Sequence, residues 1–242
     1  MCSVEKRGNI FILTLTTNND DVNDEHRLNP TLIASIRSAI SDIKSQATAS
    51  PNTSFALITT TTGKFFSNGF DLRWAQSSGK FLNNLHLMVD SFKPLIADFI
   101  SLPMPTIAAI NGHAAAAGFA LALSHDYMLM RKDRGVLYMS EVDIGMTFPE
   151  YFNVLFREKV GWKARREIMM RGKKVRGDEG VKMGIVDEAL ESGVFERGLK
   201  LAEELIKKKW NGEVYAEIRK GMFPDLSQEL GLTRKAVVAS RL

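Results

Sequence analysis

The chain of 242 residues is 45% hydrophobic and 25% charged, a composition typical of a globular protein that buries a substantial core. No run approaches the roughly eighteen apolar residues of a membrane span, and residues 1–9 lack the apolar stretch of a secretory signal, so we expect neither. The single cysteine, Cys2, excludes an intrachain disulfide and a zinc site built on several cysteines. The net charge of +4 favours an anionic partner only mildly, because such a charge also keeps a protein soluble.

The first half of the chain alternates between strand and helix patterns. Strands are expected where apolar, β-branched residues cluster, and helices where apolar residues recur three and four positions apart. Prolines that follow such a pattern end the helix. In chain order we expect a strand over 9–15, a helix over 30–43, a strand over 54–60, a glycine-bearing loop over 63–71 and a helix over 83–101.

The second half begins with a wholly apolar strand over 106–110, which is typical of a buried parallel sheet. A small-residue stretch over 112–123 and a strand over 127–130 follow, so this part forms a tight crossover unit. From Glu150 onward the pattern is almost all helical. The sequence therefore predicts an α/β core followed by a helical C-terminal part.

Two loops, 64–72 and 111–120, combine glycine with small residues directly after a buried strand. Glycine lets the backbone approach a ligand closely, and the second loop opens a helix whose free N–H groups favour a negative oxygen. Two such N–H groups converging would form an oxyanion hole. For either loop alone the alternative remains that small residues only allow a helix to pack closely on the sheet.

Three motifs, at 67–72, 105–114 and 124–127, together resemble the enoyl-CoA hydratase/isomerase, or crotonase, superfamily. The resemblance extends from about Ile10 through Val186. It implies an α/β fold of the ClpP/crotonase-like type, a spiral of ββα turns with a helical C-terminal region that builds trimers. We accordingly expect a spiral core over 1–190 that holds the coenzyme A and active sites, and a helical region over 191–242.

The resemblance also implies catalytic roles for particular residues. The oxyanion donors would be the backbone N–H groups of Phe70 and Ala117. Family hydratases use two glutamates, but one of these positions is Ala120 here, and an alanine cannot move a proton. The other glutamate is Glu141, in a segment that resembles that of the Δ3,Δ2-enoyl-CoA isomerases, most of all the plant peroxisomal ones. One carboxylate suffices to shift a double bond, so we expect an isomerase without a metal or redox cofactor.

Glu141 would remove a C2 proton from a 3-enoyl thioester and return it at C4. Its apolar sequence neighbours would raise its pKa if they line the pocket; these are Met139, Val142, Ile144, Met146 and Phe148. The alternative is that Glu141 is a surface residue near a strand end. Glu150 is a rival base, because some isomerases of another subgroup place their glutamate nearby.

The acyl-CoA substrate requires contacts for its phosphates, and Arg27 and Arg73 are the candidate cations by family position. His113 and His125 lie at strand–helix junctions, and we expect both to be structural. Asp71 and Asp126 are expected to be loop or cap residues. The remaining substrate-binding candidates in the family segments are Leu28, Phe66, Ser67, Asn68, Gly69, Phe70, Leu72 and Ala117.

Further interpretations of the sequence concern the binding partners of the protein and its location in the cell. The residues Ser240, Arg241 and Leu242 resemble the Ser-Lys-Leu peroxisomal address, so we expect an import receptor and a peroxisomal location. The segment 157–176 contains nine Lys or Arg and two Glu, and RNA-binding relatives exist in the superfamily. Trp162 and Ile168 interrupt that run at helical spacing, so a helix with a solvated basic face explains it and we expect no nucleic-acid partner. A 2-enoyl-CoA hydratase, a thioester hydrolase and an inactive scaffold are the remaining alternatives.

Overall fold

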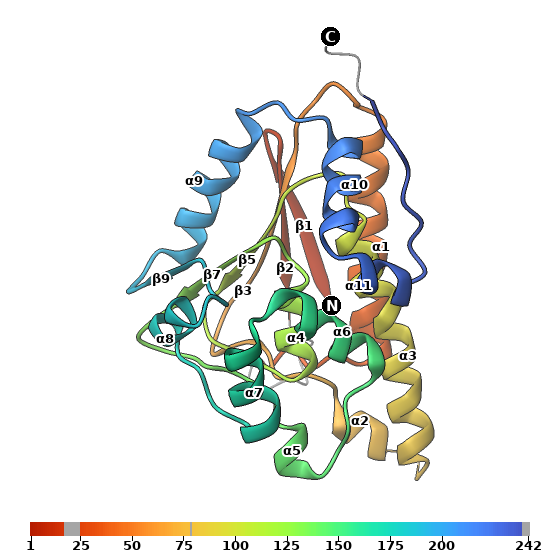
Figure 1. Cartoon of the computed structure of the whole chain (residues 1–242), viewed down its shortest axis with the longest axis vertical. Helices are drawn as coiled ribbons and strands as arrows, with labels where there is room; N and C mark the ends of the chain where they lie inside the picture. The colour runs from red at the N-terminus through yellow and green to blue at the C-terminus, as the bar shows by residue number, and fades with distance from the viewer. Residues whose placement is uncertain (17–24, 78, 239–242) are drawn as a thin grey trace.

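The computed structural model describes residues 1–16, 25–77 and 79–238, arranged as sheets flanked by helices (Figure 1). The strands of this part are β1 (Cys2–Arg7), β2 (Ile10–Leu15), β3 (Ala56–Thr61), β4 (Phe65–Ser67), β5 (Thr106–Ile110), β6 (His113–Ala115), β7 (Tyr127–Arg131), β8 (Leu137–Tyr138) and β9 (Glu188–Leu190). The helices are α1 (Pro30–Thr48), α2 (Leu72–Gln76), α3 (Phe81–Ile100), α4 (Ala117–Leu123), α5 (Glu141–Ile144), α6 (Glu150–Lys159), α7 (Trp162–Arg171), α8 (Gly177–Lys182), α9 (Val194–Ile206), α10 (Gly212–Met222) and α11 (Pro224–Glu229). None of the described helices is long and apolar enough to cross a bilayer.

The larger sheet has six strands in the order β1-β2-β3-β5-β7-β9. All neighbouring pairs are parallel except β1 with β2, which pair antiparallel from Cys2↔Leu15 to Arg7↔Ile10. Every residue of β3 and of β5 is buried, because helices cover both faces of the sheet there. This explains the continuous apolar run at 106–110 that predicted a parallel strand.

Strand β1 was not predicted from the sequence, because residues 1–9 read as polar. All of its residues except Cys2 are exposed, and Glu5, Lys6 and Arg7 are charged. It lies at the edge of the sheet, where charged side chains oppose pairing with another chain.

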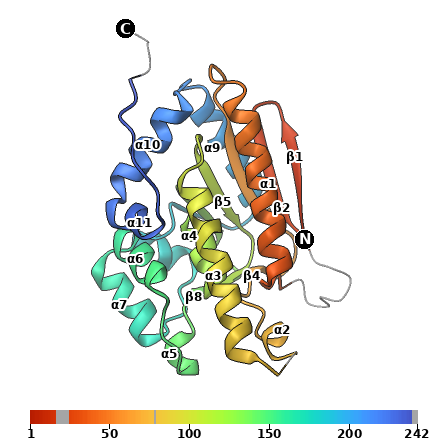
Figure 2. The same ribbon diagram turned by 90° about the vertical axis from the view of Figure 1, so that its right-hand side faces the viewer.

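Helices α1 and α3 lie on one face of the large sheet and α9 lies on the other (Figures 1 and 2). The second layer forms because Val194, Ala202 and Leu205 of α9 pack against Ile58 and Leu129 of the sheet. The first helix of the expected C-terminal region therefore contributes directly to the core.

The chain winds through three successive turns of two strands and a helix: β3-β4-α2, β5-β6-α4 and β7-β8-α5. In each turn one strand joins the large sheet and the next joins a three-stranded sheet of order β4-β6-β8. The expected ββα spiral is thus confirmed. Strands β4, β6, β8 and β9 were missed because two or three residues are too few to show alternation, and β9 corrects the expectation of almost continuous helix after Glu150.

A buried ion pair fastens α10 to the sheet. Arg219 is 3% exposed, and its Nε and Nη2 donate to the two carboxylate oxygens of Asp126 at 2.6 and 2.5 Å. The same guanidinium donates to the backbone oxygens of Leu102 (2.7 Å) and Met104 (2.5 Å), which follow α3. Asp126 was expected to be a loop or cap residue. It lies in a loop, but it also accepts from the Thr106 N–H at 2.9 Å and forms this buried pair, so it joins three elements.

His125 is buried beside this pair, and its Nε2 lies 2.7 Å from Thr59 Oγ1. Burial lowers the pKa of His125 to about 4, so the ring is neutral and structural, as expected.

Candidate active site

The two small-residue loops lie against each other at the end of the three-stranded sheet. A Cβ on Gly69 would lie 2.9 Å from the Ala115 oxygen and 3.4 Å from the Ala117 nitrogen. A Cβ on Gly118 would lie 2.3 Å from the Ser67 oxygen. Only glycine permits these approaches, and Gly69 also has a positive φ of 73°. The segment before Phe70 is thereby held beside the first turn of α4.

Two backbone N–H groups at this junction are available to a ligand. Leu28 N–H donates to the Gly69 oxygen at 2.8 Å, and Asp71 N–H donates to the Leu28 oxygen at 3.1 Å. The N–H of Phe70 between them donates to no described residue. Ala117 is the first residue of α4, where N–H groups lack helical partners, and its N–H likewise donates to no residue of the described ranges.

Ala116 is strained directly before the second of these donors. Its φ of 48° and ψ of −121° lie in a region that residues with a Cβ rarely adopt. Its N–H donates to the Tyr138 oxygen at 2.9 Å, and its own oxygen accepts from Phe119 and Ala120 N–H groups at 2.9 and 3.0 Å. Such strain persists where the surroundings fix the backbone. The sequence analysis did not single out Ala116, because an alanine carries no local sign of a positive φ.

Glu141 is the first residue of α5, three positions after β8. Because Tyr138 of β8 pairs with Ala115 of β6, the start of α5 follows the strand next to the oxyanion loops. The side chain is buried, at 8% exposure, and Oε2 accepts no hydrogen bond from the described part of the chain. Burial raises the pKa of Glu141 to about 7, although backbone N–H groups at 140–141 oppose this.

Only part of the apolar sequence around Glu141 is buried. Met139 is fully buried, and Met146 packs with Phe70 against one apolar cluster. Val142 and Ile144 are 47% and 51% exposed, so only some of these sequence neighbours help to bury the carboxylate. The reading of Glu141 as a surface residue is also wrong.

The rival Glu150 has a different environment. It is exposed at the first turn of α6, and its carboxylate accepts from Asn153 Nδ2 at 3.3 Å. The structure thus offers one buried carboxylate in this region and one that is solvated.

Among the candidate substrate contacts, Phe66 and Ser67 need correction. The Phe66 side chain is 0% exposed within the main core, so it cannot flank an adenine or pantetheine group. Ser67 is also buried, and its hydroxyl donates to the His26 oxygen at 2.8 Å. Leu28 has a buried side chain, so both Leu28 and Ser67 can meet a ligand only through their backbone.

The two candidate cations differ. Arg27 forms an ion pair with Glu25, whereas Arg73 is exposed on α2. Asp71 caps α2 by accepting from the Trp74 N–H at 3.0 Å, as expected of a cap residue. Asn68, through its N–H, donates to the Glu25 oxygen at 2.8 Å, which ties the first oxyanion loop to the segment that carries Arg27.

The basic run over 157–176 is divided between α6 and α7, with Gly161 between the two helices. Arg157 pairs with Asp225 and Arg171 pairs with Glu167, so part of its charge is compensated. Trp162 is 61% exposed, which corrects its interpretation as part of a buried helix face.

The chain is similar in sequence and in fold to known proteins. A sequence model of the family described as enoyl-CoA hydratase/isomerase matches residues 16–236. Enoyl-CoA delta isomerase 2, peroxisomal, of Arabidopsis thaliana is 55% identical over 249 residues, covering 100% of both chains. Enoyl-CoA delta isomerase 1, peroxisomal, of the same plant is 49% identical over 93% of this chain and 91% of its own. A crystal structure of a probable enoyl-CoA hydratase from Mycobacterium tuberculosis has the same fold, with a TM-score of 0.82, 22% identity, and coverage of 95% and 91% of the two chains.

Proposed function

The chain belongs to the enoyl-CoA hydratase/isomerase family, and we propose that it is a Δ3,Δ2-enoyl-CoA isomerase that acts in the β-oxidation of unsaturated fatty acids. The observation that carries the proposal is the buried carboxylate of Glu141, which follows the strand next to two interlocked loops. The Phe70 and Ala117 N–H groups of those loops donate to no residue that the structure describes. Ala120 is fully buried one turn into α4, where a hydratase of this family has its second glutamate.

In the proposed reaction Glu141 removes a C2 proton from a 3-cis or 3-trans enoyl thioester. The resulting charge delocalises onto the thioester oxygen, which the N–H groups of Phe70 and Ala117 stabilise. Glu141, now protonated, donates the proton at C4, and the double bond moves to the 2-trans position. Proton loss and gain balance within the substrate, so the reaction requires no metal and no redox cofactor.

The pKa of about 7 suits this role. A carboxylate with an ordinary pKa would be a weak base, whereas a group with a pKa near the working pH both accepts and returns a proton efficiently. Burial supplies that shift and also strengthens the oxyanion interaction by excluding water.

The coenzyme A portion would lie along the segment 26–29 and the loop 67–72, where the backbones of Leu28 and Gly69 are already joined. Arg27 and Arg73 are proposed to face its phosphates, and Leu72, which is partly exposed, its apolar part. By family analogy the chain assembles as a homotrimer through its helical C-terminal region.

A peroxisomal location agrees with the names of the Arabidopsis relatives. The residues Ser240, Arg241 and Leu242, which we propose the import receptor reads, lie outside the described residues.

The test compares two reactions of the purified chain. We expect it to isomerise 3-hexenoyl-CoA faster than it hydrates crotonyl-CoA, each measured as kcat/KM. Faster hydration would make the chain a 2-enoyl-CoA hydratase and would overturn the proposal. Absence of both reactions would favour a scaffold or another thioester chemistry. A salt-dependent mobility shift with RNA would instead support the nucleic-acid reading.

A further inference from the structure

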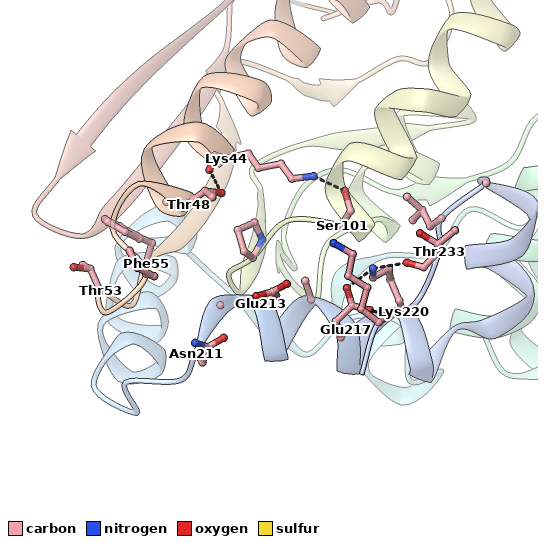
Figure 3. A pocket seen from close by; sticks show the side chains of 18 residues that line it. Lys44, Thr48, Thr53, Phe55, Ser101, Asn211, Glu213, Glu217, Lys220 and Thr233 are labelled. Atoms are coloured by element: carbon pink, nitrogen blue, oxygen red, sulfur yellow. Dashed lines mark hydrogen bonds and ion pairs between the residues drawn. The ribbon is translucent and has the colours of Figure 1, made fainter. Parts of the chain in front are cut away.

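A cavity of about 520 Å³ lies between α1, α10 and the segment 231–235 (Figure 3), at the end of the large sheet where β3 and β5 begin. Its lining includes Phe55 and Pro103, which precede β3 and β5, whereas Phe70 and Ala117 come after those strands. The cavity is thus separate from the proposed active site. Its volume falls within the range of about 300–1,000 Å³ that small-molecule sites occupy.

The walls come from five parts of the chain: the end of α1, the segment 51–55 before β3, the segment 101–103 after α3, one side of α10 and the segment 231–235. Lys44 reaches from α1 across to Ser101 after α3, with Nζ and Oγ 3.3 Å apart (Figure 3). Much of the remaining lining is apolar, namely Ala47, Pro51, Phe55, Pro103, Ala216 and Leu232.

One wall is held by a closed set of polar contacts. Lys220 is 7% exposed, and its ammonium donates to Glu217 Oε1 at 2.5 Å and to the Thr233 oxygen at 2.7 Å. The other oxygen of Glu217 accepts from the Lys235 N–H at 2.7 Å. These contacts fix the C-terminal segment against α10, and they occupy the Glu217 carboxylate.

Two further ammonium groups line the cavity without a directly paired carboxylate among the described residues. Neither Lys44 nor Lys235 forms an ion pair with a carboxylate in residues 1–16, 25–77 and 79–238. Glu213 is the only other carboxylate of the described lining. Three lysines and two glutamates give the lining a net charge of +1, from +3 − 2.

We propose that this cavity is a second binding site, for a small amphipathic anion: an apolar body that packs on Phe55, Pro103 and Leu232, and an acidic head group between Lys44 and Lys235. The apolar lining provides the hydrophobic contact, and the two ammonium groups outside ion pairs provide charge-assisted hydrogen bonds. Because the segment 231–235 forms one wall, an occupant would also hold that segment against α10.

Octanoate is a suitable probe, and octanamide is its uncharged counterpart. Isothermal titration with the full chain should show saturable octanoate binding, with octanamide weaker by about tenfold or more. Lys44→Met and Lys235→Met should each weaken octanoate binding, whereas Glu213→Gln should strengthen it because a repelling charge is removed. Lys182→Met, on exposed α8, is the matched control and should leave binding unchanged.

Hydrogen exchange locates the site. Octanoate should slow exchange of the backbone amides over 231–235, and none of these variants should alter isomerase kcat/KM. The proposal is overturned if octanoate does not saturate, if inorganic phosphate binds equally well, or if protection falls on 67–72 and 141–146 instead. Loss of binding on adding a CoA thioester would likewise assign octanoate to the active site.

Discussion

Two carboxylates with little exposure to solvent, Glu141 and Asp126, have opposite pKa shifts. Asp126 receives two hydrogen bonds from Arg219, and the Thr106 N–H donates a third. Burial alone would raise the pKa of Asp126, but the Arg219 guanidinium holds this pKa below its ordinary value. Glu141 forms no ion pair within residues 1–16, 25–77 and 79–238, and burial raises its pKa to about 7.

The difference separates a structural charge from a proposed catalytic one. A buried carboxylate that is fully compensated stays ionised and holds elements together, here α10, β5 and the end of α3. A buried carboxylate without compensation is poised between protonation states, which a proton shuttle requires.

The largest effect is expected from Glu141→Gln, which keeps the shape of the side chain but removes the base. We expect kcat for 3-hexenoyl-CoA isomerisation to fall by about 10³-fold. The measurement is the ultraviolet absorbance of the conjugated product. Glu150→Gln is the matched control and should keep near-normal activity, because Glu150 is exposed. Full activity in Glu141→Gln would refute the assignment.

Arg219→Met should be the most destabilising of these changes, because it leaves Asp126 buried and unpaired. We expect the free energy of unfolding to fall by about 3–5 kcal/mol, measured by urea denaturation. Adding Asp126→Asn to the same chain should recover part of this loss. Arg157→Met, at an exposed ion pair with Asp225, is the control and should change stability by at most about 1 kcal/mol.

The stability of Glu141→Gln relative to the parent should depend on pH. The folded pKa of about 7 exceeds the ordinary value of 4.5, so the folded state binds this proton more tightly. The resulting stability is fully present below pH 4.5 and is lost as the pH rises through about 7. The free energy of unfolding of the variant minus that of the parent should therefore increase by up to about 3 kcal/mol between about pH 4 and about pH 8. A pH-independent difference would argue against a shifted carboxyl.

The smallest effect is expected in the pH dependence of kcat/KM of the parent enzyme. Glu141 acts as a base only when ionised, so kcat/KM for 3-hexenoyl-CoA should level off above pH 7. Below that value it should fall about tenfold per pH unit. Flat kcat/KM from about pH 5 to about pH 8 would show that another group carries the proton.

Much of the site could be predicted from linear motifs. Gly69 and Gly118 marked the close approach of two loops, and Glu141 followed a recognisable segment, because both depend on short runs of neighbouring residues. The sequence could not predict that the Phe66 side chain is buried and therefore cannot contact the substrate. The sequence indicated a loop at Phe66, whereas this residue lies in β4, and its burial depends on which face of β4 meets the core.

The buried parallel strands were determined by local pattern, because apolar runs, helical spacing and glycines carry their structural preference in sequence. The spiral was implied by the family resemblance instead, since β4, β6 and β8 are too short to show a pattern. Only the tertiary structure decided which charged side chains are buried and which of them are paired. Glu141 and Glu150 are the same residue type nine positions apart, and only the packing around α5 buries one while α6 leaves the other in solvent. Likewise Arg219 meets Asp126 from 93 positions away. A pKa depends on every group that surrounds a side chain in space, and sequence proximity does not specify that surrounding.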